Sequence, residues 1–391
     1  MPDKKRMVPC DVLVVGGGIA GTAAAISAAR AGAQVVLVEK NGYFGGTIVG
    51  AMHQALCGFY GLKKPSASTR TIHGGFADEF CAALKGAAVL QMGRVFVLSA
   101  GYKNTAAVLA EFIRSEKRIR FIRGTVFNAE CRNHVVDSFR IRTAKKNYQI
   151  CSQAVVDASG NNAVMRCMGM DGIYERDESR QLGGFSVRLS GIARGHEMLE
   201  IKVPYWLSKV QSEKNLPSYC RFTQFLPGPR PREGFLKICV ADKESPQFAR
   251  LLVMVLHRYL REVLPEMSAS RISGFSERVF PRQDERSRGA YILTGEDVVS
   301  GRRFMDAAAR GAWPSEFWDK DNGPQYRYVE NGHYEIPKRC LQSRRFENLF
   351  AAGTMISADP SAHASARVSG IALATGEAAG RLAAEYCRSS K

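Results

Sequence analysis

The stretch from residue 11 to residue 39 constrains the fold more than any other part of the sequence. Residues 11–15 (DVLVV) are short, apolar and rich in β-branched side chains, which predicts a buried strand. A glycine-rich turn follows, then an alanine-rich segment that predicts a helix over 19–32, and then a second apolar strand over 34–39. Strand, helix and strand within about thirty residues form a βαβ unit, so the sequence predicts an α/β fold on a parallel sheet.

The glycines in this turn have the G-x-G-x-x-G spacing of a dinucleotide-binding motif. Gly16 permits a tight turn, Gly18 lets the backbone approach a pyrophosphate, and Gly21 lets the helix pack against the strands. The N-terminus of the helix then directs N–H groups and a partial positive charge at the phosphates. We therefore expect a nucleotide diphosphate on the turn formed by Gly16, Gly17, Gly18, Ile19, Ala20 and Gly21.

The residues at the end of the second strand indicate which nucleotide fits. The Glu39 carboxylate can accept hydrogen bonds from both ribose hydroxyls of an adenosine, and its charge disfavours the 2′-phosphate of NADP. Lys40 follows directly, and a second glycine-rich stretch contains Gly45, Gly46 and Thr47. We expect these residues to contact the cofactor as well.

These stretches resemble the large superfamily of glutathione-reductase-type flavoproteins, and within it the FAD-dependent oxidoreductase family related to the fumarate reductase flavoproteins. Three further stretches carry the resemblance: AVVDASG at 154–160, YEIPKRCLQSRRFENLFAAG at 334–353, and ERSRGAYILTGEDVVSGRRF at 285–304. The resemblance covers nearly the whole chain and implies non-covalently bound FAD. The further cofactor-binding residues that it implies are Val126, Ala158, Ser159, Gly160, Gly353, Val368 and Ser369.

The rest of the chain predicts a smaller domain inserted into this unit. We expect a Rossmann-like, three-layer FAD-binding domain made of residues 8–170 and 335–391, with an antiparallel meander beside its parallel sheet. We expect an α+β substrate or cap domain at 171–334. Patterning predicts helices over 76–90, 104–116, 246–264 and 367–386, and mainly short strands and loops over 185–240.

Four residues are candidates for catalysis. Arg367 precedes the last helix, where a cation can stabilise charge on a reduced flavin. His363 lies in the preceding loop and is either a proton donor, a substrate ligand or a loop histidine without chemistry. Arg286 and Arg288 either clamp a substrate carboxylate or pair with neighbouring acidic residues.

Two residues after the second glycine stretch, His53 and Cys57, are expected near the flavin. Disulfide reduction is disfavoured because Cys57 lacks a partner at the CxxxxC spacing. The ten cysteines are scattered and include no CxxC pair, which indicates reduced thiols and no metal site. The apolar run VLVVGGGIAG near the N-terminus has too many glycines for a secretory signal, so we expect a cytoplasmic location. No stretch is long and apolar enough to predict a transmembrane segment.

The net charge of +18, from 55 basic and 37 acidic residues, gives little further guidance. No arginine-rich block or RNA-binding signature accompanies it, so we expect a diffuse basic surface and no specific nucleic acid partner.

The predicted function is hydride transfer between a small organic substrate and FAD. No second G-x-G-x-x-G follows a strand, so no dedicated NAD(P)H domain is expected, and the electron donor or acceptor stays open. The alternatives are a flavoprotein that acts on RNA and a non-catalytic nucleotide-binding module.

Overall fold

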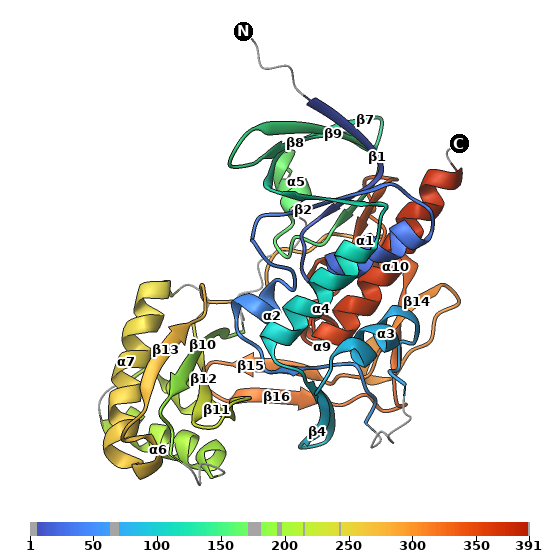
Figure 1. Ribbon diagram of the computed structural model, residues 1–391. Helices are drawn as coiled ribbons and strands as arrows, with labels where there is room; N and C mark the ends of the chain where they lie inside the picture. Colours follow the sequence, from blue (N-terminus) through green and yellow to red (C-terminus); the bar gives the residue numbers. More distant parts are fainter. Residues whose placement is uncertain are drawn as a thin grey trace.

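The chain folds around one large sheet whose parallel strands carry helices on one face, and the antiparallel meander at one end of this sheet packs over the other face (Figure 1). This computed structural model describes residues 6–62, 70–170, 181–193, 198–213, 216–241 and 244–389. Within those ranges the main sheet has seven strands in the order β6-β2-β1-β9-β8-β7, with β18 also paired to β9. Their bounds are β1 Arg6–Val15, β2 Val35–Glu39, β6 Ile119–Arg123, β7 Thr125–Arg132, β8 Val135–Arg142, β9 Asn147–Asp157 and β18 Leu349–Ala351.

The strand directions confirm the predicted Rossmann-like fold with its antiparallel meander. Strands β6, β2, β1, β9 and β18 run parallel, while β7, β8 and β9 are antiparallel neighbours. The turn between β7 and β8 uses Asn133 and His134, both at positive φ, as a tight two-residue hairpin requires. The carboxyl ends of β1, β2, β9 and β18 meet at one edge of the sheet, where ligands bind in open α/β folds.

Helices from both ends of the sequence cover the face of the main sheet that the meander leaves free. These helices are α1 (Ile19–Arg30), α3 (Gly75–Ala83), α4 (Tyr102–Ser115) and α10 (Ser369–Ser389). Helices α1 and α10 touch backbone to backbone, because a Cβ on Gly376 would lie 2.1 Å from the Ala20 carbonyl oxygen. Residues separated by about 350 positions therefore form one core layer.

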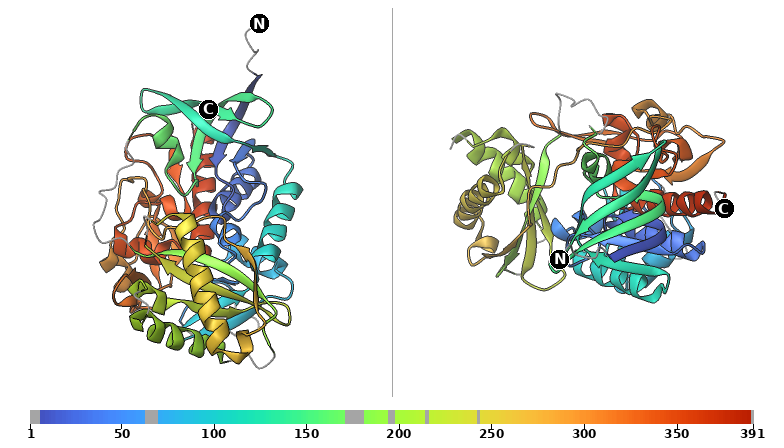
Figure 2. Two further views of the ribbon diagram at one scale, coloured as in Figure 1. Left: turned by 90° about the vertical axis from the view of Figure 1, so that its left-hand side faces the viewer. Right: turned by 90° about the horizontal axis from the view of Figure 1, so that it is seen from above.

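A second sheet forms the predicted inserted α+β unit. Strands β11 (Gln224–Pro227), β12 (Glu233–Val240), β10 (Gly183–Ser190) and β13 (Arg271–Phe275) pair in that order and run antiparallel. Helices α6 (Leu199–Glu213) and α7 (Pro246–Val263) lie on its outer side, away from the main sheet (Figures 1 and 2).

The segment between this unit and the C-terminal helices contributes to both parts of the molecule. It contains α8 (Gly295–Val299), the pair β14 (Ala307–Gly311) and β17 (Tyr334–Pro337), and the hairpin of β15 (Ser315–Asp319) and β16 (Gly323–Arg327). Leu293 and Trp313 belong to a hydrophobic cluster with α9 (Pro360–Ala366) and α10, whereas Trp318 belongs to the core of the inserted unit. The proposed boundary at residue 334 thus remains a prediction.

The remaining short elements connect these layers. They are α2 (Thr47–Gly50), β3 (Ala55–Leu56), β4 (Ala88–Met92), β5 (Val95–Ser99), α5 (Ala163–Cys167), and single turns of 3-10 helix at Ser218–Phe222, Pro265–Met267, Lys338–Cys340 and Gly353–Met355.

Several predicted helices need correction. The helix predicted over 76–90 ends at Ala83 because Gly86 adopts a φ of +75° in the following turn, and Ala88–Met92 is a strand. Helix α6 was missed within 185–240, although its buried residues recur at helical spacing, because Pro204 interrupts the pattern. The last helix begins at Ser369 rather than at residue 367.

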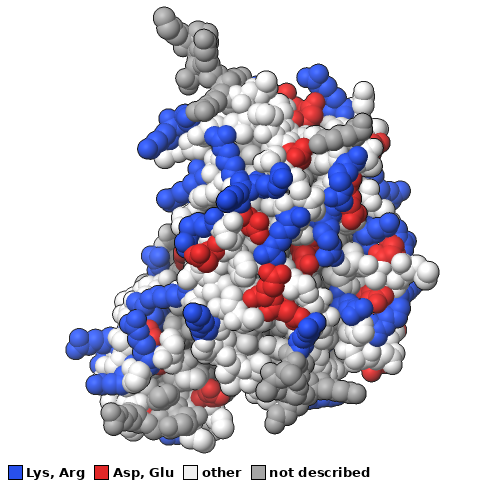
Figure 3. All heavy atoms as spheres, turned by 45° about the vertical axis from the view of Figure 1, so that its right-hand side comes forward, with Lys and Arg blue, Asp and Glu red and all other residues white. Residues whose placement is uncertain are grey.

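The molecular surface carries mixed charge. On the face drawn in Figure 3, Lys and Arg are spread among Asp and Glu rather than gathered into one patch. Among the described residues, no helix is long and apolar enough to span a bilayer.

Candidate functional site

The turn after β1 is packed so closely that only glycine fits at two of its positions. Gly16 has a φ of +102°, and a Cβ there would lie 2.5 Å from the Ala158 carbonyl oxygen. A Cβ on Gly21 would lie 1.9 Å from the Gly16 carbonyl oxygen. The first and third glycines of the motif therefore hold the turn against the start of α1 and the end of β9.

The second glycine of the motif has a different environment. A Cβ on Gly18 would meet only the Gly46 Cα, at 4.0 Å, so the two glycine stretches face each other without side chains between them. The Gly45 N–H donates to the Gly17 carbonyl oxygen at 2.9 Å and ties the stretches together. Gly18 is the N-cap of α1 and has no side-chain cap in the described structure, which leaves helix N–H groups available for an anion.

Glu39 is held in place by backbone N–H groups. Its Oε2 accepts the Gly17 N–H and its Oε1 accepts the Asn41 N–H, each at 2.6 Å, and the side chain is 6% exposed. Each carboxylate oxygen keeps a second lone pair that can accept a ribose hydroxyl. The residue is thus fixed in position for the role predicted from its place in the sequence.

The turn after β9 is held by a buried aspartate. Asp157 is 1% exposed and accepts the N–H groups of Ser159 (2.9 Å) and Val164 (3.1 Å). Burial raises the pKa of this carboxyl. Ser159 Oγ in turn accepts the Ala163 N–H at 3.0 Å, and a Cβ on Gly160 would lie 3.6 Å from Thr354 Oγ1. The turn therefore faces the one that follows β18.

The C-terminal stretch closes on the same edge of the sheet. The Gly353 N–H donates to Thr375 Oγ1 of α10 at 3.1 Å, and a Cβ on Gly353 would lie 2.8 Å from the Ala20 Cβ. At the start of α10, Ser369 Oγ accepts the Cys57 N–H (2.9 Å) and donates to the Cys57 carbonyl oxygen (3.0 Å). The Val368 side chain lies against Gly58.

The other residues predicted to bind the cofactor differ in how exposed they are to solvent. Lys40 and Thr47 are exposed at the two ends of the second glycine stretch, while Ile19 and Ala20 are buried in the first turn of α1. The Val126 side chain is buried between the main sheet and the meander, so only its backbone can reach a ligand.

These residues fit an FAD molecule. Backbone approaches backbone without side chains at Gly18 and Gly46, a fixed carboxylate lies beside the turn, and the N-terminus of a twelve-residue helix begins there. A sequence profile for FAD dependent oxidoreductases matches residues 11–391. The chain belongs to the FAD dependent oxidoreductase family. The expectation of FAD as the cofactor is confirmed, while the contacts of individual residues with it stay predictions.

Two curated proteins match short segments of this FAD dependent oxidoreductase. One is the 4-oxocyclohex-2-ene-1-carboxylate 5-dehydrogenase of Sinomonas cyclohexanicum, 54% identical over 44 residues, which covers 11% of this chain and 8% of that protein. The other is the cinnamate reductase of Clostridium sporogenes, 63% identical over 38 residues, which covers 10% of this chain and 6% of that protein. The chain thus matches less than a tenth of the length of either relative.

Solved structures resemble the FAD dependent oxidoreductase over most of its length. A geranylgeranyl bacteriochlorophyll reductase-like protein from Thermoplasma acidophilum has 14% identity and a TM-score of 0.45, with 98% of this chain and 79% of that chain covered. The p-nitrophenol 4-monooxygenase of Pseudomonas putida has 12% identity and a TM-score of 0.45, with 99% and 82% covered.

In this oxidoreductase, His363 is a buried neutral imidazole. It is 1% exposed, and burial, followed by the charges of Arg286 and Arg367, lowers its pKa well below the ordinary value. Its Nε2 lies 3.1 Å from the Thr354 carbonyl oxygen, which can only accept, so Nε2 carries the hydrogen. Nδ1 is then a hydrogen-bond acceptor without a partner in the described structure. The geometry favours a ligand-binding role over proton donation at neutral pH.

The structure separates the two predicted carboxylate-binding arginines. Arg286 is 4% exposed, whereas Arg288 is exposed to solvent. Their expected structural partners pair with other arginines: Arg166 binds Glu285 (2.9 Å) and Asp284 (3.8 Å), and Arg327 binds Glu296 (3.9 Å). The two guanidinium groups differ in exposure, and a joint carboxylate clamp stays a prediction.

Arg367 lies in a group of side chains that the sequence did not connect. Its Nη2 donates to the Glu316 carbonyl oxygen at 3.4 Å, and its electrostatic neighbours include Arg282 and Cys57. Lys237 belongs to the same group. No local motif marks Lys237, Arg282 or Glu316, because each comes from a different segment of the chain.

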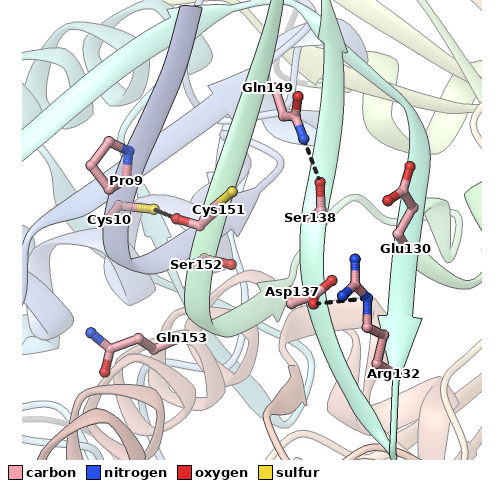
Figure 4. Close-up of a pocket in the computed structure, with 10 residues that line it drawn as sticks. All are labelled: Pro9, Cys10, Glu130, Arg132, Asp137, Ser138, Gln149, Cys151, Ser152 and Gln153. Carbon is pink, nitrogen blue, oxygen red and sulfur yellow. Dashed lines mark hydrogen bonds and ion pairs between the residues drawn. The ribbon is translucent and has the colours of Figure 1, made fainter.

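A shallow groove of about 460 Å³ lies elsewhere, on β1 and the meander (Figure 4). Gln149 Nε2 donates to Ser138 Oγ at 3.2 Å, and Arg132 pairs with Asp137 at 3.8 Å along its floor. None of the residues predicted to bind FAD or substrate is among those that line it: Pro9, Cys10, Glu130, Arg132, Asp137, Ser138, Gln149, Cys151, Ser152 and Gln153.

Proposed function

We propose that this chain transfers a hydride between a small organic substrate and non-covalently bound FAD. The observation that carries the proposal is the pair of side-chain-free stretches at Gly18 and Gly46, placed beside the fixed carboxylate of Glu39. When bound, FAD supplies the redox chemistry, and the protein supplies binding, orientation and electrostatics.

The chain's own residues would divide this work by position. The N-terminus of α1 and the two glycine stretches would hold the diphosphate, and Glu39 would accept the ribose hydroxyls. His363 Nδ1 would accept a hydrogen bond from the cofactor or the substrate. Arg367, held beside Glu316, would supply positive charge near the reacting groups.

The remaining aspects of function belong to the same proposal. A small-molecule substrate, an electron partner other than a built-in NAD(P)H domain, and a cytoplasmic location are supported by the sequence alone. The ten cysteines, which all lie in the described ranges, are free thiols, as a reducing compartment would keep them. The family match gives no support to action on RNA or to a non-catalytic module.

The test is to purify the protein, identify the bound flavin, and follow its spectrum anaerobically. We expect FAD in about equimolar amount, reduction or re-oxidation by at least one compound of a metabolite panel, and FAD release on denaturation without covalent attachment. A protein that cannot be reconstituted with FAD would contradict the cofactor site. A flavin that exchanges electrons with no compound would contradict catalysis.

A further inference from the structure

Four separate chain segments bring charged side chains together, and a fifth adds His53 and Cys57. We call this group the charge cluster and define it as Lys237 on β12, Arg282 after β13, Glu316 on β15 and Arg367 between α9 and α10, together with His53 and Cys57. The members interact electrostatically with one another. For example, burial, followed by the charges of Lys237, Arg282 and Arg367, lowers the pKa of His53.

Glu316 is the single carboxylate of the charge cluster, and two tryptophans hold it. Trp313 Nε1 donates to Glu316 Oε2 at 2.9 Å, and Trp318 Nε1 donates to Oε1 at 2.6 Å. The charges of Arg367 and Lys237 help to hold the pKa of Glu316 below its ordinary value against the opposing effect of burial. The carboxylate is therefore ionised at neutral pH.

Two cations of the charge cluster are arranged around the Trp318 ring. The Arg282 guanidinium lies 4.2 Å from the ring centroid and the Lys237 ammonium lies 5.7 Å from it. Arg282 also donates through Nη1 to the carbonyl oxygens of Leu182 and Gly183. These contacts fix the position of the cations without neutralising them.

The charge cluster carries more positive than negative charge. Lys237, Arg282 and Arg367 oppose only Glu316, because the pKa of His53 is lowered to about 3 and the imidazole is neutral. Two donors of these arginines have no partner in the described structure: Nη2 of Arg282, which is 8% exposed, and Nε of Arg367. Buried guanidinium donors are costly unless an acceptor satisfies them.

Three members of the charge cluster are only partly exposed to solvent. Lys237, Glu316 and Arg367 are half-buried, and burial is the main cause that lowers the pKa of Lys237 and of Arg367. These groups are partly removed from water by the surrounding protein. An anion that contacts them there gains more from each cation than it would at a fully exposed surface.

We propose that the charge cluster binds the carboxylate of an organic acid, and that this acid is the substrate of the proposed oxidoreductase. The proposal rests on the proposed function only in naming the acid as the substrate. An arginine fork and an ammonium group match a carboxylate, and the buried indoles of Trp313 and Trp318 hold Glu316 beside these cations.

The test is calorimetric titration of the FAD-loaded protein with benzoate and acetate, with benzamide as the neutral analogue of benzoate. We expect benzoate to bind and benzamide to bind at least about tenfold more weakly. Lys237→Met should weaken benzoate binding at least about tenfold and leave benzamide unchanged. Arg114→Met, which removes a largely exposed arginine of α4, should change neither affinity and serves as the matched control.

A second variant gives a change of the opposite sign. Glu316→Gln removes the only negative charge of the charge cluster, so benzoate should bind several-fold more tightly. A group that only stabilised the fold would not strengthen binding of an anion. Glu316→Gln is nearly isosteric, so we expect this variant to fold. It therefore still tests the proposal if Lys237→Met fails to fold.

Several outcomes would overturn the proposal. They are equal affinities for benzoate and benzamide, binding of neither carboxylate, binding of inorganic phosphate in place of the carboxylates, or unchanged benzoate affinity in folded, FAD-loaded Lys237→Met. Failure of the proposed function has a different signature: carboxylates would bind as expected, while the flavin would exchange electrons with no compound.

Discussion

The glycine turn and the charge cluster are two sites built in opposite ways. The glycine turn lies within residues 16–46 and works because side chains are absent where backbones meet. The charge cluster draws its side chains from five segments, and its proposed binding of an acid depends on cations that outnumber the one carboxylate. The comparison shows that the residues of a backbone site can lie close together in the sequence. The residues of a site made from side chains are brought together only by the whole fold.

Gly21→Val should have the largest effect, because it tests the backbone packing of the glycine turn itself. A Cβ at this position would lie 1.9 Å from the Gly16 carbonyl oxygen, so α1 must move away from β1. We expect the free energy of unfolding to fall by at least about 3 kcal/mol, measured by urea denaturation.

The control for this variant is Gly184→Ala on β10. A Cβ there would meet nothing within 4 Å, so the free energy of unfolding should change by less than about 0.5 kcal/mol. Equal losses in the two variants would show that the contact between Gly21 and Gly16 is not what holds the turn.

Gly18→Ala should separate cofactor binding from folding. The folded protein has room for the added methyl group, whose closest neighbour would be the Gly46 Cα at 4.0 Å. A pyrophosphate on the same backbone would be displaced, and FAD affinity should fall by about 100-fold, the equivalent of one or two lost hydrogen bonds. The melting temperature of the FAD-free protein should stay unchanged. Unchanged FAD affinity would place the diphosphate elsewhere.

The pH dependence of benzoate binding should distinguish the charge cluster from a histidine site. Burial and the neighbouring Arg282 lower the pKa of Arg367 to about 10, and the same two causes lower the pKa of Lys237. Both cations are protonated below their pKa, so affinity should be flat from about pH 6 to about pH 8 and lost as pH rises further. A step in affinity near the ordinary histidine pKa would contradict this assignment.

Arg288→Met should have the smallest effect, and it tests the carboxylate clamp predicted from the sequence. Arg288 is exposed, so the free energy of unfolding should change by less than about 0.5 kcal/mol and benzoate affinity should stay the same. Arg286→Met removes a buried guanidinium instead and should cost about 1–3 kcal/mol. A loss of benzoate affinity in Arg288→Met would move the acid site to the surface.

The sequence was sufficient for the glycine turn because the glycines and the flanking strand and helix all lie within about thirty residues, although the backbone that Gly16 meets belongs to the distant Ala158. Gly16 and Gly21 meet backbone atoms at distances no side chain tolerates, and the flanking strand and helix follow from short-range patterning. The parallel sheet and its antiparallel meander followed from the same reasoning combined with a family resemblance. Where one residue changes the local preference, as at Gly86 or Pro204, the predicted helices were wrong.

The charge cluster was beyond such reasoning for a physical reason. Lys237, Arg282 and Glu316 each stand in an ordinary segment, and only tertiary packing places them around the Trp318 ring. Even for α7, whose existence was predicted, the range alone did not identify the buried face: the apolar residues Leu251 and Val255 are 63% and 47% exposed. Helical periodicity locates a stripe only to within about one residue.

The contact between α1 and α10 can form only late in the synthesis of the chain. Ser27 and Glu377, which are hydrogen-bonded, are separated by 350 residues, so a ribosome adding about 5–20 residues per second needs roughly 20–70 s to supply the second helix after the first has emerged. During that interval α10 does not yet cover the alanine-rich surface of α1, and nascent chains would depend on chaperones to avoid misfolding.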